Sequence, residues 1–181
     1  MPRTFCFVDL TGFTKFTAAE GDDAAAELLS AFRAVARDVA SNRGVRVAKW
    51  LGDGLMVVAV DQGDAVAFAL ELEERATECC SPLSLRIGIA SGYALLFEGD
   101  DYIGSAVNLA ARLCDAAGPG EVLVPADMLN TLPQGVEAST VGAVGLPGFP
   151  DPVEVVELWG HGAPSALFDS GELWTRTPFA V

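Results

Sequence analysis

Two aspartates, Asp9 and Asp53, lie where two apolar segments could bring their carboxylates together. Asp9 lies at the end of the apolar run Thr4–Leu10, and Asp53 lies in the Gly-Asp-Gly turn before Leu55–Val60. Each has an ordinary structural explanation, because a carboxylate caps the turn after a strand and Asp-Gly is a common hairpin turn. If the two segments are neighbouring strands, however, the carboxylates meet and repel each other unless a cation lies between them. Oxygen ligands alone favour Mg²⁺ or Mn²⁺, which accompany phosphate groups.

Lys49 and Asp101 are two further charged residues that a simple core does not explain. In the expected strand Val45–Trp50, alternation puts Lys49 on the same face as Val45 and Val47. A lysine in that position either extends to solvent at the sheet edge or donates a hydrogen bond into a cleft. Asp101 lies in an acidic loop, where it is explained by itself as a solvated carboxylate.

Asn108 and Arg112 lie four residues apart in the expected helix Ser105–Ala117, so their side chains share one helix face. A surface pair without function is the simple explanation, although the surrounding segment is otherwise apolar. Each of these six polar residues can be explained structurally on its own. All six together are better explained by a site.

The apolar patterns between these residues predict an α+β fold, with helices that cover a largely antiparallel sheet. Asp22 and Asp23 are expected to supply the N-cap and the acidic first turn of the first long helix. Two hairpins are expected, one turning at Asp53 and one turning around Gly92. The expected strands are Thr4–Leu10, Val45–Trp50, Leu55–Val60, Leu83–Ser91, Tyr93–Glu98, Glu121–Val124, Val136–Val141 and Val153–Trp159, and the expected helices are Ala24–Ser41, Asp64–Cys80, Ser105–Ala117 and Ala126–Leu132.

The composition excludes several classes of function. The 181 residues suffice for one domain, and 11 basic against 25 acidic residues give a net charge of −14, which leaves no basic face for nucleic acid or a membrane surface. The apolar stretches are too short to cross a bilayer, and the N-terminus lacks the features of a signal peptide. The four cysteines show no metal-ligand spacing. We therefore expect a cytoplasmic protein without membrane insertion.

Four ordered motifs in this chain resemble the class III nucleotidyl cyclase catalytic domain, in particular its compact actinobacterial type. The motifs are Phe7–Phe13, Lys49–Asp53, Arg86–Gly92 and Asp101–Leu113, and the resemblance extends from about Thr4 to Trp159. It implies a ferredoxin-like palm with a βαββαβ core and extra C-terminal strands and a helix. The implied domain covers residues 1–160, with 161–181 as a C-terminal tail or arm.

The resemblance also implies a role for each polar residue. Two aspartates hold two divalent cations, Mg²⁺ or Mn²⁺, a Lys/Asp pair reads the purine, an asparagine orients the ribose, and an arginine stabilises the transition state. In the family these groups meet at a head-to-tail dimer interface, with the metal aspartates from one subunit and the others from its partner, so a homodimer would hold two sites. In this chain the matching residues are, in the same order, Asp9 and Asp53, Lys49 and Asp101, Asn108, and Arg112.

The resemblance implies an adenylyl cyclase that converts ATP to 3′,5′-cyclic AMP and pyrophosphate through in-line attack of the ribose 3′-hydroxyl on the α-phosphate. Adenine offers an acceptor at N1 and a donor at its amine, which complements a lysine and a carboxylate, whereas guanine inverts this edge. One departure is that no lysine or arginine lies between Arg112 and Arg176 to contact the outer phosphates. Backbone N–H groups at Leu10, Thr11, Gly12 and Phe13 are expected to contribute to triphosphate binding instead.

Two alternatives remain open at this point. The first is a catalytically weak or inactive cyclase-homology domain that acts as a nucleotide-binding regulatory module, which the missing phosphate-side cation favours. The second is another palm-type nucleotidyltransferase, such as a cyclic-dinucleotide synthase. Its Gly-Gly-acid-Glu-Phe signature is absent, because the hairpin here reads Leu-Gly-Asp-Gly-Leu over residues 51–55.

Overall fold

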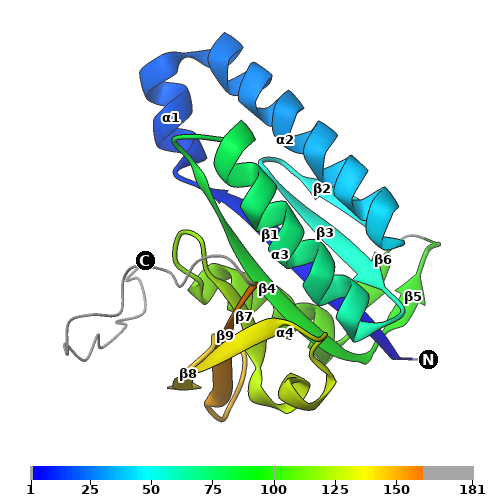
Figure 1. Ribbon diagram of the computed structural model, residues 1–181. Helices are drawn as coiled ribbons and strands as arrows, with labels where there is room; N and C mark the ends of the chain where they lie inside the picture. The colour runs from blue at the N-terminus through cyan, green and yellow to red at the C-terminus, as the bar shows by residue number, and fades with distance from the viewer. Residues whose placement is uncertain (1, 100, 161–181) are drawn as a thin grey trace, which may run out of the picture.

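The computed structural model describes residues 2–99 and 101–160, so the expected tail at 161–181 lies outside the described residues. The chain forms one large mixed sheet with helices on both faces, which confirms the α+β class (Figure 1). The strands are β1 (Pro2–Thr11), β2 (Arg46–Leu51), β3 (Gly54–Ala59), β4 (Ser84–Tyr93), β5 (Leu95–Phe97), β6 (Asp101–Ile103), β7 (Val122–Pro125), β8 (Val136–Val144) and β9 (Val153–Gly160). The helices are α1 (Phe13–Glu20), α2 (Asp22–Arg43), α3 (Gln62–Cys79), α4 (Ser105–Ala116) and the 3₁₀-helix η1 (Ala126–Thr131).

The seven strands of the large sheet lie in the order β2-β3-β1-β4-β7-β9-β8, and β5 and β6 form a separate two-stranded hairpin. All neighbouring strands are antiparallel except β4 and β7, which are parallel. Strand β1 therefore lies inside the sheet, with the β2–β3 hairpin on one side and β4, the central strand, on the other. This arrangement is the one that brings the ends of β1 and of the β2–β3 hairpin together.

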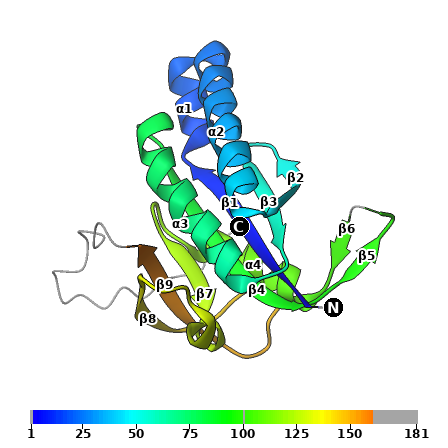
Figure 2. The ribbon, with the colours of Figure 1, turned by 45° about the vertical axis from the view of Figure 1, so that its right-hand side comes forward.

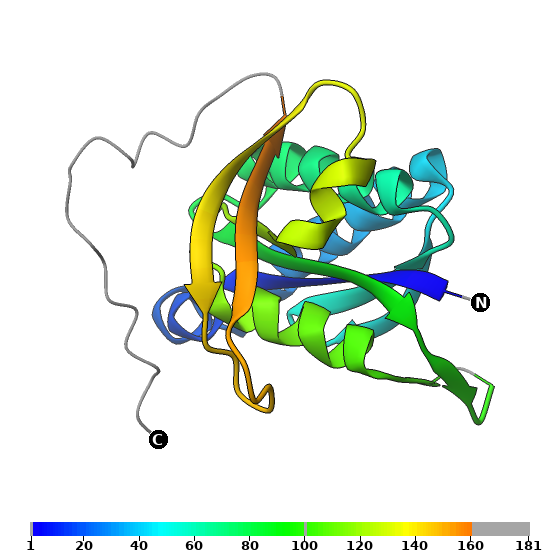
Figure 3. The ribbon, with the colours of Figure 1, turned by 90° about the horizontal axis from the view of Figure 1, so that it is seen from below.

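Two separate hydrophobic cores lie on the two faces of the sheet. The larger core lies between the sheet and helices α2 and α3, and it contains Phe32 and Phe68, both fully buried. The smaller core lies beneath α4, where Ala110 and Leu113 pack against Phe5 and Ala90. Figure 3 shows α4 and the α2/α3 pair on opposite sides of the central strands. We refer to these two sides as the α2/α3 face and the α4 face.

The structure adds a helix before α2 that the sequence analysis did not expect. Helix α1 has eight residues and lies between Gly12 and Gly21, both of which have positive φ. Its Phe13 and Phe16 pack partly against the larger core, but a helix this short gives too weak a periodic signal to be recognised. The expected N-cap of α2 was also wrong, because Gly21 is the N-cap, whereas Asp22 and Asp23 do form the acidic first turn.

The expected hairpin around Gly92 was wrong as well. Strand β4 runs straight through this glycine and pairs with β1 along its whole length, up to the pair Pro2 and Tyr93. Strand β5 pairs with β6 instead. The glycine is explained by packing, because a Cβ at Gly92 would lie 2.9 Å from the Cβ of Ala106 at the start of α4. The sequence pattern could not distinguish a glycine that turns the chain from one that admits a helix.

Candidate active site

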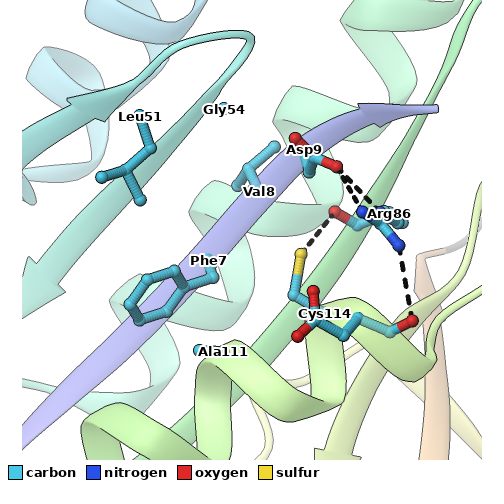
Figure 4. Close-up of a pocket in the computed structure, with 9 residues that line it drawn as sticks. Phe7, Val8, Asp9, Leu51, Gly54, Arg86, Ala111 and Cys114 are labelled. Atoms are coloured by element: carbon cyan, nitrogen blue, oxygen red, sulfur yellow. Dashed lines mark hydrogen bonds and ion pairs between the residues drawn. The ribbon is translucent and has the colours of Figure 1, made fainter. Parts of the chain in front are cut away.

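A pocket of about 230 Å³ lies at the end of β1 on the α4 face (Figure 4). Its walls are β1 around Asp9, the β2–β3 hairpin at Leu51 and Gly54, Arg86 on β4, and the end of α4. Figure 4 shows Asp9 and Arg86 pointing toward each other, with α4 contributing Ala111 and Cys114 from below. Four segments that are separated in the sequence therefore meet at this pocket.

The two predicted metal-binding aspartates lie close together, as expected from neighbouring strands. Asp9 pairs in register with Gly54, the residue after Asp53. This approach needs a glycine, because a Cβ at Gly54 would lie 2.5 Å from the Val8 carbonyl oxygen and 3.1 Å from Oδ1 of Asp9. Burial raises the pKa of Asp53 above its ordinary value, a backbone hydrogen bond lowers it, and the negative charge of Asp9 raises it further.

Asp9 and Asp53 could supply only some of the oxygen ligands that a divalent cation needs. Across residues 2–99 and 101–160, no three His, Cys, Asp or Glu side chains gather into a ready metal site. Two carboxylates satisfy only part of the six-fold oxygen coordination of Mg²⁺, so phosphate oxygens and water would supply the remainder. The donor set therefore suits a metal ion that arrives with a phosphate ligand.

Arg86 lines the pocket, although the sequence analysis quoted it within a motif and gave it no role. It lies opposite Asp9 in the β1–β4 register, and its Nε and Nη2 atoms donate to Oδ2 of Asp9 at 2.9 and 2.6 Å. Its Nη1 atom donates to the Asp115 carbonyl at 3.4 Å. Period-two alternation could have found it, because Arg86 shares the α4 face with Gly88 and Ala90.

Lys49 and Asp101 form an ion pair across two strands that are not sheet neighbours. The expected face of Lys49 was wrong, because β2 contains a β-bulge between Val47 and Lys49. Val47 lies opposite Val57, which belongs to the larger core, whereas Lys49 lies opposite Met56, which belongs to the core beneath α4. The bulge therefore turns the lysine to the α4 face, where it reaches Asp101.

The other predicted residues are not among those that line this pocket. Asn108 and Arg112 are exposed on α4, and Nη1 of Arg112 donates to Oδ2 of Asp115 at 2.9 Å. Leu10 and Thr11 belong to β1 and pair with β4, whereas Gly12 and Phe13 begin α1. The N-terminus of a helix, not an open loop, therefore follows β1.

The comparisons with known proteins decide the family. A family model described as the adenylate and guanylate cyclase catalytic domain matches residues 3–159. This chain belongs to that family. The cyclase domain is 38% identical over 160 residues to an uncharacterized protein of Mycobacterium tuberculosis. That alignment covers 88% of this chain and 41% of the relative. It is also 39% identical over 118 residues to an adenylate cyclase of Streptomyces coelicolor, in an alignment that covers 65% of this chain and 31% of that enzyme.

Solved cyclase structures share the fold of this cyclase domain. The adenylyl cyclase CyaB from P. aeruginosa is 27% identical, with a TM-score of 0.76 over 87% of this chain and 93% of that chain. The guanylate cyclase domain of RhGC from Catenaria anguillulae has a TM-score of 0.75 at 18% identity, over 88% of this chain and 96% of that chain. The cyclase domain spans less than half the length of the curated relatives that it matches. None of its described helices is both long and apolar enough to span a membrane.

Proposed function

We propose that this cyclase domain converts ATP to 3′,5′-cyclic AMP and pyrophosphate. The observation that carries the proposal is the ion pair between Lys49 and Asp101, which come from different strands and present a donor and an acceptor together. This pair complements the N1 acceptor and the amine donor of adenine, whereas guanine presents the opposite pattern. Relatives that bear the name adenylate cyclase support the same substrate.

Asp9 and Asp53 are proposed to hold two divalent cations, Mg²⁺ or Mn²⁺, against the triphosphate. When bound, such cations lower the pKa of the attacking hydroxyl and neutralise the charge of the leaving pyrophosphate. Arg112 would donate to the α-phosphoryl oxygens as negative charge develops there, and Asn108 would orient the ribose. The N–H groups at the start of α1 would bind phosphate oxygens, because a helix N-terminus carries unpaired donors.

The catalytic unit is proposed to be a head-to-tail homodimer with two sites. In this arrangement, Asp9 and Asp53 of one subunit face Asn108 and Arg112 of its partner, which explains why both α4 residues point outward in the single chain. The β5–β6 hairpin projects from the domain (Figure 2). It also carries exposed apolar side chains, which supports an interface there. Leu95 is 73% exposed and Ile103 is 55% exposed, an arrangement typical of a surface that a partner covers.

Arg86 is proposed to supply the phosphate-side cation that the sequence analysis did not find. Arg86→Gln is expected to raise the KM for the metal–ATP complex by about tenfold, because the proposed charge-assisted hydrogen bond from Arg86 to a phosphate oxygen would be lost. Steady-state kinetics over a range of ATP at saturating Mn²⁺ measures this. Arg3→Gln is the matched control, since Arg3 lies at the opposite end of β1 and bonds only to the neighbouring Pro2 carbonyl among the described contacts. Equal KM values for Arg86→Gln and wild type would contradict a role for Arg86 in phosphate binding.

The first test of the proposed function is product formation from ATP and, separately, from GTP with Mn²⁺. We expect cyclic AMP from ATP and little cyclic GMP. Lys49→Glu should abolish the ATP reaction, because a carboxylate would then face the N1 acceptor of adenine. Arg46→Glu reverses a charge at an exposed position of the same strand and should leave activity near wild type. Nucleotide binding without product, from a metal-loaded dimer, would favour the regulatory module instead.

A further inference from the structure

Arg33 on α2 contacts the turn that carries Asp53, although it lies on the opposite face of the sheet from the pocket. Its Nη2 atom donates to the Gly52 carbonyl at 3.0 Å. Gly52 and Asp53 are the two residues of the β2–β3 turn, and Gly52 has a φ of 69°, in the left-handed region. The carbonyl that Arg33 holds and the N–H of Asp53 belong to one planar peptide unit. Fixing that carbonyl therefore fixes the backbone from which the Asp53 side chain departs.

The guanidinium of Arg33 is also held by an aromatic ring. Its Cζ lies 5.0 Å from the ring centroid of Trp50, and Cζ of Arg37, one helical turn later, lies 5.0 Å from the same ring. Trp50 packs partly against the larger core and lies two residues before Gly52. The two arginines therefore connect α2 to the strand that leads into the turn, but only Arg33 has a recorded hydrogen bond to the turn itself.

The position of Arg33 carries a cost that an ordinary surface arginine would avoid. Within the described residues, its Nε atom is fully buried and has no hydrogen-bond partner. A buried unpaired donor destabilises the folded state, and rotation into solvent would relieve it. The side chain keeps its place because the stack on Trp50 and the bond to Gly52 hold it there.

We propose that Arg33 is a positioning residue, which holds the Gly52–Asp53 peptide so that Asp53 presents its carboxylate beside Asp9. Arg33 touches neither substrate nor metal in this role. The catalytic consequence rests on the proposed function, whereas the ordering of the turn does not. Loss of the guanidinium should weaken metal binding by allowing the turn to move, while the purine-reading pair remains in place.

The test compares Arg33→Met with Arg37→Met, which removes the other stacked guanidinium but not the bond to Gly52. Arg33→Met should speed amide hydrogen exchange in the 50–56 segment. It should also raise by about tenfold the Mn²⁺ concentration for half-maximal cyclase activity, the range expected for one charged hydrogen bond, with kcat at saturating Mn²⁺ within about twofold of wild type. Arg37→Met should stay near wild type in both measurements.

A binding measurement separates this proposal from the proposed function. Free Mn²⁺ is followed by EPR in the presence of 3′-deoxy-ATP, which lacks the attacking hydroxyl, so no turnover is needed. If wild type forms no cyclic AMP, the exchange and Mn²⁺ comparisons still decide the role of Arg33. Equal effects of the two Met variants, or unchanged exchange in Arg33→Met, would overturn the proposal. If either Met variant fails to fold, Arg33→Lys and Arg37→Lys are compared by the same criteria, because lysine retains the charge but not the planar guanidinium that lies over Trp50 while it donates to Gly52.

Discussion

Asp53→Ala and Arg112→Ala are each expected to lose at least about 100-fold in cyclase activity, whereas an equal mixture of the two recovers about a quarter of the wild-type rate. Each variant alone lacks one essential group in both sites. In a mixed dimer, one site combines the intact Asp53 of one subunit with the intact Arg112 of the other. Random exchange makes about half of the dimers mixed, and each of those has one working site of two.

A third variant gives this experiment an internal control. Asp53→Ala mixed with the double variant Asp53→Ala/Arg112→Ala exchanges subunits in the same way, but no chain in that mixture carries Asp53. That mixture should stay inactive. Subunit exchange is followed with differently tagged chains, and every variant is first shown to be folded. Mixed dimers without recovered activity would contradict the head-to-tail arrangement.

Gly88→Ala is expected to destabilise the domain by about 3 kcal/mol or more, the upper part of the range for overpacking. Helix α4 lies directly on β4 at this glycine. An added Cβ would lie 2.2 Å from the Cys114 amide nitrogen and 2.3 Å from the Ala110 carbonyl oxygen. Both contacts are backbone atoms, so no side-chain rotation relieves them. The helix must move away, and Asn108 and Arg112 move with it.

Urea unfolding measures this loss, and Gly145→Ala serves as the matched control. A Cβ at Gly145 meets no atom within 4 Å, so this substitution should change the free energy of unfolding by less than about 0.5 kcal/mol. Activity should fall in Gly88→Ala even at temperatures where the protein stays folded, because α4 carries two of the proposed site residues. Equal stability of the two variants would contradict the close contact of α4 with β4.

Most of the fold could be predicted because apolar periodicity reports burial directly. That pattern predicted the two long helices that begin near Asp22 and Asp64. It also predicted the strands next to Asp9 and Asp53, and with them the approach of the two aspartates. Helix α1 is too short for such a signal. Strand β4 continues through Gly92 instead of turning there. The glycine is needed for the contact with Ala106, which is 14 residues further along the chain, so the local sequence gives no sign of its role.

The orientation of a candidate site residue could be predicted less well than its position in the chain. The resemblance gave Lys49 a role, but residue alternation put its side chain on the wrong face, because a bulge depends on the register with the partner strand and has no signal in the strand itself. Arg86 was missed for a related reason. Its importance comes from lying opposite Asp9 across two strands that are 77 residues apart in sequence.

The bulge before Lys49 lies in β2, at the outer edge of the seven-stranded sheet, with β3 as its only neighbour in that sheet. A change of residue or of register there disturbs a single ladder and leaves the central strands as they are. Lys49, the side chain proposed to face the base, is therefore separated structurally from the strands that carry Asp9 and Arg86. Base preference in such a domain can diverge through a few substitutions at its margin, while the machinery for phosphate chemistry is inherited unchanged.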